Sequence, residues 1–157
     1  MTTLEMEIAL MNHLGIRRNI VVPNVHWGID YSLHECDLLC LTKSRLATEV
    51  EIKISKADLL KDKEKNHNHS HPLIRRTFFA VPEKLKDLAV EELDQRFGVL
   101  SVTARHGRYY VREVRKAKIN SKAKKWSDDM YLKLLHLGCM RIMTLKKQLL
   151  KSKKNKR

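Results

Sequence analysis

Two neighbouring segments of the chain carry acidic side chains in a pattern that suits the binding of a metal ion. Asp37 interrupts the apolar run 36–41, and Glu51 lies in the run 46–54, where charged side chains alternate with Val and Ile. Both runs are typical of strands. If the turn between them centres on Ser44, Asp37 lies opposite Glu51, with Cβ atoms about 4.5–5.5 Å apart. Two carboxylates at that separation repel each other unless a cation lies between them. Because carboxylate oxygens, backbone carbonyls and water suit hard divalent ions, the pattern predicts a site for Mg²⁺ or Mn²⁺.

Lys53 adds a cation to the same face of the second run. It lies two residues beyond Glu51, which places it about 7 Å further along a strand. Metal-assisted hydrolysis of a phosphodiester needs carboxylates for the ion and a cation near the attacking water or the phosphate. The alternative is a half-exposed strand whose Glu and Lys side chains face water. Asp37 favours the site, because an Asp inside an apolar strand is disfavoured by propensity.

These residues stand in a longer pattern that resembles the PD-(D/E)xK nuclease superfamily. The core of the pattern is Asp37 followed by Glu51-Ile52-Lys53. More closely, the stretch HECDLLCLTKSRLATEVEIKISKADLLKDKEK, followed by RTFFAVPEKL, is similar to a small bacterial branch of the superfamily that is associated with DNA repair. The similarity covers residues 4–103. A Cys stands where the superfamily's name has Pro, a position at which many members also lack Pro.

The resemblance implies an αβββαβ core, divalent-metal hydrolysis of phosphodiesters, and DNA as the usual substrate. By match to the superfamily's motif, Asp37, Glu51 and Lys53 are the catalytic residues. The metal ligands implied by the same match are Glu7, Asp37, Glu51 and the carbonyl of Ile52, with Mg²⁺ or Mn²⁺ as the cofactor.

Three other functions remain open at this point. One is a nuclease-fold protein that binds DNA without cutting it, although the presence of Asp37, Glu51 and Lys53 favours an enzyme. Another is an RNA-directed nuclease of the same fold, because the sequence does not distinguish DNA from RNA. The third is an interaction protein whose basic helix binds an acidic partner. A homodimer is compatible with the sequence, and the pathway, whether DNA repair or a mobile element, is not specified by it.

Glu7 belongs to a segment, residues 3–14, that is expected to form an amphipathic helix. At 100° per residue, apolar side chains gather on one face, namely Leu4, Ile8, Met11 and Leu14. Glu7 falls within that face and Glu5 points away from it. A carboxylate that faces a core needs a partner or a metal ion, so Glu7 is the expected ligand from this helix.

The net charge of +14 is concentrated at the C-terminal end. From Arg115 onward there are 15 Lys and Arg residues against two Asp, whereas residues 1–114 are close to neutral. Such an asymmetry attracts polyanions, of which nucleic acid is the commonest, although a solubilising tail is the alternative. The lysines expected to contact nucleic acid are Lys56, Lys61, Lys122, Lys124, Lys125, Lys146 and Lys147.

Runs of strand and helix type alternate along the chain, which predicts an α/β sandwich of the restriction-endonuclease-like type, with a central mixed sheet flanked by helices. We expect strands at 20–22, 25–27, 36–41, 46–54, 76–81, 99–103 and 109–114, and helices at 55–65 and 83–95. Residues 1–120 would form the nuclease core. Residues 121–157 would add a basic helix that starts near Ser127 and ends near Leu150, followed by a disordered tail.

Several other residues allow two interpretations. Glu49 is either a polar strand residue or an extra ligand. His67, His69 and His71 lie in a loop with Pro72, either solvated or in transient contact with metal or phosphate. Cys36 and Cys40 should face the core, and Trp126 should anchor the C-terminal helix. No partner is evident for His26, His34 or His106.

Some classes of protein are excluded by composition. No run of 18 apolar residues occurs in the 157-residue chain, so no transmembrane segment is expected. The N-terminal segment carries two Glu residues and no basic leader, which argues against a secretory signal. The three cysteines are an odd number, and Cys36 and Cys40 lie too far apart in one strand to bridge. We therefore expect reduced thiols and a cytoplasmic location, of a bacterial or phage type.

Overall fold

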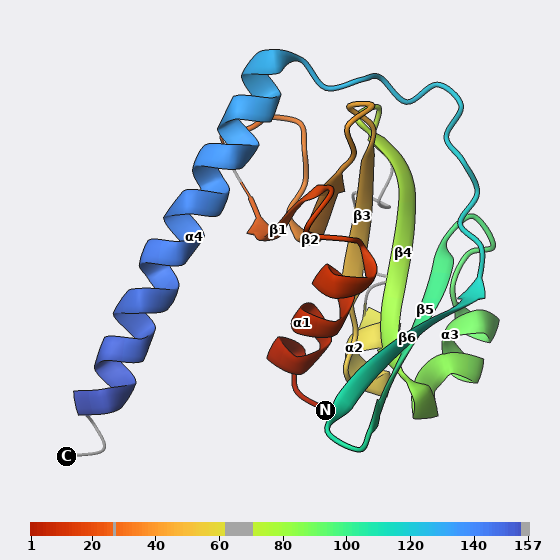
Figure 1. The fold of residues 1–157 in the computed structure, drawn as a ribbon. Helices are drawn as coiled ribbons and strands as arrows, with labels where there is room; N and C mark the ends of the chain where they lie inside the picture. Colours follow the sequence, from red (N-terminus) through yellow and green to blue (C-terminus); the bar gives the residue numbers. More distant parts are fainter. Residues whose placement is uncertain (27, 62–70, 155–157) are drawn as a thin grey trace.

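A single open sheet runs through the centre of the protein (Figure 1). The structure is a computed structural model that describes residues 1–26, 28–61 and 71–154. Within those ranges, six strands lie side by side in chain order, and they are β1 (Ile20–Val25), β2 (Cys36–Leu41), β3 (Ala47–Ile52), β4 (Ile74–Pro82), β5 (Gly98–Arg105) and β6 (Arg108–Arg115). β3, β4 and β5 are parallel to one another, and the other neighbouring pairs are antiparallel. The sheet is therefore mixed, as predicted.

Helices flank this sheet and complete an α/β sandwich. They are α1 (Thr3–His13), α2 (Lys56–Lys61), α3 (Lys86–Glu92) after the 3₁₀ turn η2 (Glu83–Leu85), and α4 (Asp128–Lys154). α2 lies in the connection from β3 to β4, and α3 lies in the connection from β4 to β5. Parallel neighbouring strands require crossover connections of this kind.

The two faces of the sheet are buried by different helices. On one face, Met6 of α1 packs in the same apolar cluster as Val50 of β3, and Figure 1 shows α1 lying across this face. On the other face, Phe79 of β4 clusters with Leu59 of α2 and Ala89 of α3. Since side chains alternate between the faces along each strand, odd-numbered residues of β3 and β4 point toward the α2 and α3 side.

The buried face of α1 differs from the predicted one. Leu4 and Ile8 are 58% and 47% exposed, whereas the side chains that enter the core are Met6, Ala9 and Leu10. The helix begins with a capping box, in which Thr2 and Glu5 bond each other's backbone amides. The predicted stripe is wrong at Leu4 and Ile8, whereas Glu7, which it placed among core residues, is half-buried.

Some element bounds also differ from the prediction. β1 is one strand rather than two short ones, because Asn24 takes a positive φ of 51° and the chain continues to Val25. The helix expected at 83–95 is split into η2 and a shorter α3. The turn between β5 and β6 is at the predicted place, where His106 and Gly107 have φ values of 50° and 72°, as a two-residue hairpin with a type I′ turn requires.

The C-terminal helix starts where it is predicted to start and continues further. Trp126 is buried, and its Nε1 donates to the carbonyl of Leu73 at 3.0 Å, which anchors the connection before α4. Ser127 Oγ accepts a hydrogen bond from the amide of Met130 at 3.2 Å. The helix then runs to Lys154 rather than ending near residue 150, so part of the expected disordered tail is helical. Its distal half extends away from the sheet (Figure 1).

Candidate functional site

The two strands that carry the predicted ligands pair in the predicted register. Leu38 lies opposite Val50, so β2 and β3 pair about a turn centred on residue 44. One step further along, the backbone amide of Asp37 lies 3.5 Å from Glu51 Oε1. Asp37 Oδ2 in turn accepts a hydrogen bond from the amide of Ile52 at 2.7 Å. The structure therefore brings Asp37 and Glu51 together.

Lys53 joins these two carboxylates from the end of β3. Its Nζ donates to Glu51 Oε2 at 3.0 Å, and both side chains are almost fully buried. The Lys53 amide bonds the carbonyl of Ala80 at 3.0 Å, which extends the pairing with β4. The Nζ also lies 5.8 Å from the centre of the Phe79 ring. Lysine and glutamate are rarely buried this deeply unless they are paired, so Asp37, Glu51 and Lys53 form one buried polar cluster.

Glu49 extends the cluster toward the start of β3. Its Oε1 lies 2.6 Å from His34 Nε2, and its Oε2 accepts a hydrogen bond from Thr77 Oγ1 at 3.1 Å. Glu49 is completely buried, so it is not an ordinary polar strand residue. The contact between His34 and Glu49 could not be predicted, because His34 lies in the loop before β2, where no periodic pattern places its side chain.

The water-facing alternative for this strand is wrong. Glu49, Glu51 and Lys53 are 0%, 2% and 4% exposed. Asp37 is only half-buried, so the cluster reaches solvent at that end. With His34, the cluster brings three carboxylates, one ammonium and one imidazole together in a largely buried region. Carboxylate oxygens gathered in this way are the ligands that a hard cation uses.

The donor set fits a hard divalent ion. Asp37 and Glu51 offer carboxylate oxygens beside one another, and Ile52 offers a backbone carbonyl between Glu51 and Lys53 in the chain. Oxygen ligands of this type are those that Mg²⁺ and Mn²⁺ prefer. These oxygen donors are compatible with Mg²⁺ or Mn²⁺, and the cofactor stays a prediction.

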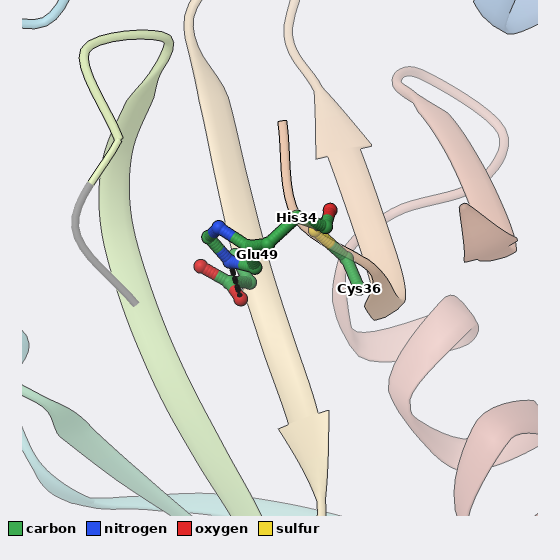
Figure 2. A group of neighbouring side chains, drawn as sticks. All are labelled: His34, Cys36 and Glu49. Atoms are coloured by element: carbon green, nitrogen blue, oxygen red, sulfur yellow. Dashed lines mark hydrogen bonds and ion pairs between the residues drawn. The ribbon is translucent and has the colours of Figure 1, made fainter. Parts of the chain in front are cut away.

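A second set of donors lies beside this cluster. His34, Cys36 and Glu49 each offer one atom within 4.8 Å of the others (Figure 2). An imidazole, a thiol and a carboxylate are ligands that Zn²⁺ accepts. In the structure, however, the imidazole and the carboxylate bond each other, and the Cys36 thiol lies 3.5 Å from the carbonyl of His34. Burial raises the pKa of the Cys36 thiol far above its usual range, which disfavours the thiolate that would bind a metal.

The cysteines otherwise behave as predicted. Cys36 and Cys40 are buried, and both are free, as is the exposed Cys139. Burial raises the pKa of the Cys40 thiol to about 11. Neither buried thiol has the depressed pKa of a nucleophile, so the two residues serve as small core side chains.

Glu7, the predicted ligand from α1, contacts the edge strand β1. The Glu7 carboxylate accepts a hydrogen bond from the side chain of Asn24 on β1, and partial burial raises its pKa above the usual range. β1 pairs directly with β2, the strand that carries Asp37. Glu5 is instead used at the helix start and by Tyr109, whose hydroxyl donates to it at 2.8 Å. Of the two acids, Glu7 is the one on the β1 and β2 side of the sheet.

The predicted nucleic-acid contacts lie on exposed parts of the chain. Every one of these lysines is exposed, namely Lys56, Lys61, Lys122, Lys124, Lys125, Lys146 and Lys147. The histidine tract is different. His67 and His69 lie outside the described residues, and His71 is buried, with its Nε2 2.9 Å from Ser32 Oγ. The interpretation of His71 as part of a solvated loop is therefore wrong.

Comparison with known proteins supports the fold alone. No protein-family description and no curated protein sequence matches the chain. Among solved structures, the SPO1766 protein of unknown function from Silicibacter pomeroyi is similar to this chain, with a TM-score of 0.64 and 18% sequence identity. The similarity covers 98% of this chain and 94% of that one. Within the described ranges, no helix has the length and apolar character needed to cross a membrane.

Proposed function

We propose that this protein is a metal-dependent nuclease that hydrolyses phosphodiester bonds of DNA. The observation that carries the proposal is the buried cluster of Asp37, Glu51 and Lys53, in which two carboxylates and one ammonium share a site that opens to solvent beside Asp37. Neighbouring carboxylates with an ammonium beside them are the groups that metal-assisted hydrolysis of a phosphodiester uses.

Each residue of the cluster has a role that follows from its contacts. Asp37 and Glu51, with the Ile52 carbonyl, would hold the ion, and Asp37 is fixed in place by the Ile52 amide. A bound Mg²⁺ or Mn²⁺ would supply Lewis acidity toward the phosphate and a water of lowered pKa. Lys53, held by Glu51, places a positive charge beside the reacting phosphate, where it would stabilise the charge that develops there.

Two further features support this proposal. The chain order α1, β1, β2, β3, α2, β4 is the αβββαβ order that the resemblance to PD-(D/E)xK nucleases implies. The basic C-terminal segment, with its exposed lysines, supplies the charge for binding a polyanion. DNA repair or the maintenance of a mobile element is the setting that we propose for the activity.

The test is a cleavage panel over duplex, single-stranded and branched DNA, with RNA controls, in Mg²⁺ and in Mn²⁺. We expect metal-dependent cleavage of DNA by the wild type. Lys53→Ala should abolish it while DNA affinity changes far less, because Lys53 acts at the reacting phosphate. Lys53→Met, which keeps most of the side-chain volume, guards against loss of folding, and the exposed Lys84→Ala is the matched control.

Two outcomes would contradict the proposal. If the folded wild type binds DNA but cuts no nucleic acid in either metal, the protein is a nuclease-fold binding protein. If RNA alone is cut, the substrate assignment is wrong and the reaction type stands.

A further inference from the structure

A cavity of about 250 Å³ lies beside the start of β4 and is not part of the carboxylate cluster. Four of the residues that line it are cationic: Arg75 and Arg76 of β4, Arg96 before β5, and Lys118 after β6. None of its lining residues is acidic. Concentrating like charges at a concave surface is unfavourable unless an anion is bound there.

Backbone hydrogen bonds hold the three cationic segments in place. The amide of Lys118 donates to the carbonyl of Arg96 at 2.9 Å, and the amide of Asn120 donates to the carbonyl of Arg75 at 2.9 Å. Asn120 Nδ2 also donates to the carbonyl of Ile74 at 3.2 Å. These hydrogen bonds fix the backbone of the cavity wall. The cationic residues are therefore brought together by the fold itself.

Three of the four cationic side chains have no acidic partner among the described residues. Arg96 has Asp94 at 4.0 Å, at the limit of an ion pair, and its guanidinium lies 4.5 Å from the centre of the Phe97 ring. Within the described ranges, Arg75, Arg76 and Lys118 form no ion pair with a carboxylate. The cavity therefore presents net positive charge to a ligand.

Thr77 connects this cavity to the carboxylate cluster. It lines the cavity, and its hydroxyl donates to Glu49 in the cluster. In the pairing of β3 with β4, Thr77 lies opposite Glu49, and Phe79 lies opposite Glu51. The cavity is therefore about two strand residues, or roughly 7 Å, from the level of Glu51.

We propose that this cationic cavity binds a backbone phosphate of the nucleic-acid strand, close to the phosphodiester at Asp37 and Glu51. The inference rests on the proposed nuclease function for the position of the second phosphate. The ligand chemistry is a phosphate group held by guanidinium and ammonium donors. This contact would set where the strand lies relative to the cluster, and it involves none of the lysines predicted from the sequence.

The test compares two variants that each lose two positive charges. The cavity variant is Arg75→Gln with Lys118→Gln, and the control is Arg105→Gln with Arg108→Gln, in the exposed β5–β6 turn. Binding of labelled duplex and single-stranded DNA is measured by fluorescence anisotropy in EDTA over a salt series, after thermal unfolding has shown that both variants fold. Because one phosphate contact is lost, the slope of log K against log salt should fall by about 0.9 on duplex and about 0.7 on single strands in the cavity variant only.

Equal decreases of this slope in the two variants would overturn the proposal, because the cavity residues would then contribute only to the net charge of the protein. Inorganic phosphate, added at matched ionic strength, distinguishes the source of the phosphate. We expect inorganic phosphate to displace DNA no better than chloride does. If phosphate displaces DNA from the wild type and not from the variant lacking Arg75 and Lys118, the ligand of the cavity is a free phosphate compound. If DNA binding depends on the cavity and no nucleic acid is cut, the proposed nuclease function is wrong and the phosphate-binding site still stands.

Discussion

The carboxylates of Asp37, Glu49 and Glu51 lie in one largely buried cluster, and a metal ion bound there would relieve the repulsion among them. We predict that Mn²⁺ or Mg²⁺ raises the melting temperature of the wild type, because an ion that binds only the folded state stabilises it by about 2.7 kcal/mol at a concentration of 100 Kd. The double substitution Asp37→Asn with Glu51→Gln should remove this response while the protein stays folded. Differential scanning fluorimetry with metal and with EDTA measures both effects.

His34→Gln is the control for this experiment. It removes an imidazole from the neighbouring group of His34, Cys36 and Glu49 and leaves Asp37 and Glu51 unchanged. The response to Mn²⁺ should persist. If the rise in melting temperature is retained in the Asp37 and Glu51 double variant and lost with His34→Gln, the ion binds to the group of His34, Cys36 and Glu49 instead.

Thr77 gives a prediction about the stability of the buried cluster. Its hydroxyl is one of the donors that satisfy Glu49, whose side chain is completely buried. Thr77→Val keeps the shape and leaves one carboxylate oxygen without that donor, so it should cost about 1–3 kcal/mol in the free energy of unfolding. Urea unfolding measures the loss. The same change at Thr48, a half-buried residue on the opposite face of β3, should stay within about 0.5 kcal/mol. Equal losses would mean that the hydrogen bond to Glu49 is of no special importance.

The contacts among Asp37, Glu51 and Lys53 follow from the sequence because they depend on local geometry. A short turn fixes the register of β2 and β3, and alternation along β3 then places Lys53 beside Glu51. His34 could not be assigned, since it reaches Glu49 from a loop with no periodic pattern. The cationic cavity was also beyond prediction, because its residues come from three segments that only the folded sheet brings together.

At the scale of elements, Glu83 joins η2 to the sheet. Lys86 donates to its carboxylate at 2.7 Å, and Ser101 and Thr103 of β5 donate to the other oxygen. These hydrogen bonds, that of Lys86 first, lower the pKa of Glu83 from 4.5 to about 2. A carboxyl group whose pKa is lower in the folded state stabilises the fold fully above pH 4.5, and this contribution disappears as the pH falls toward 2.

We therefore predict that Glu83→Gln lowers the melting temperature at neutral pH. The difference from the wild type should shrink as the pH falls from 4.5 toward 2, because the wild-type carboxyl group is then protonated as well. Thermal unfolding followed by circular dichroism over this range measures the difference. The exposed acid Glu91 of α3 provides the control, since Glu91→Gln should change little at any pH. A constant difference for Glu83→Gln across the range would contradict the assigned role.

The elements of the fold were predictable where the pattern is strong and short-range. The order of strands and helices, and the starts of β2, β5 and α4, agree with expectation to within a residue or two. The face of α1 was not predictable, because apolar residues lie on several sides of this helix and packing against the sheet decides which of them are buried. The end of α4 was also missed, since a run of lysines is compatible both with helix and with disorder.

On the scale of the whole molecule, the buried cluster and the exposed positive charge belong to different parts of the fold. The sheet and its flanking helices carry the buried cluster, whereas α4 leaves the body and carries exposed lysines toward the C-terminus (Figure 1). Such an arrangement allows the helix to contact a polyanion over several phosphates while the sheet presents the cluster. The contribution of the helix end to binding can therefore be measured without disturbing the site.

Removal of residues 151–157 should weaken DNA binding at low salt and leave folding and metal binding unchanged. Residues 151–153 are exposed at the end of α4, so their loss should not alter the melting temperature. Each phosphate contact that is lost should reduce the slope of log K against log salt by about 0.9 on duplex DNA. A full-length control, in which the same cations are replaced by Gln, separates charge from helix length; the replaced residues are Lys151, Lys153, Lys154, Lys156 and Arg157. Both variants should flatten the slope equally in an anisotropy titration. Slopes identical to that of the wild type would show that this segment only solubilises the protein, and the argument from charge for a nucleic-acid partner would then depend on the cationic cavity and on the lysines before residue 151.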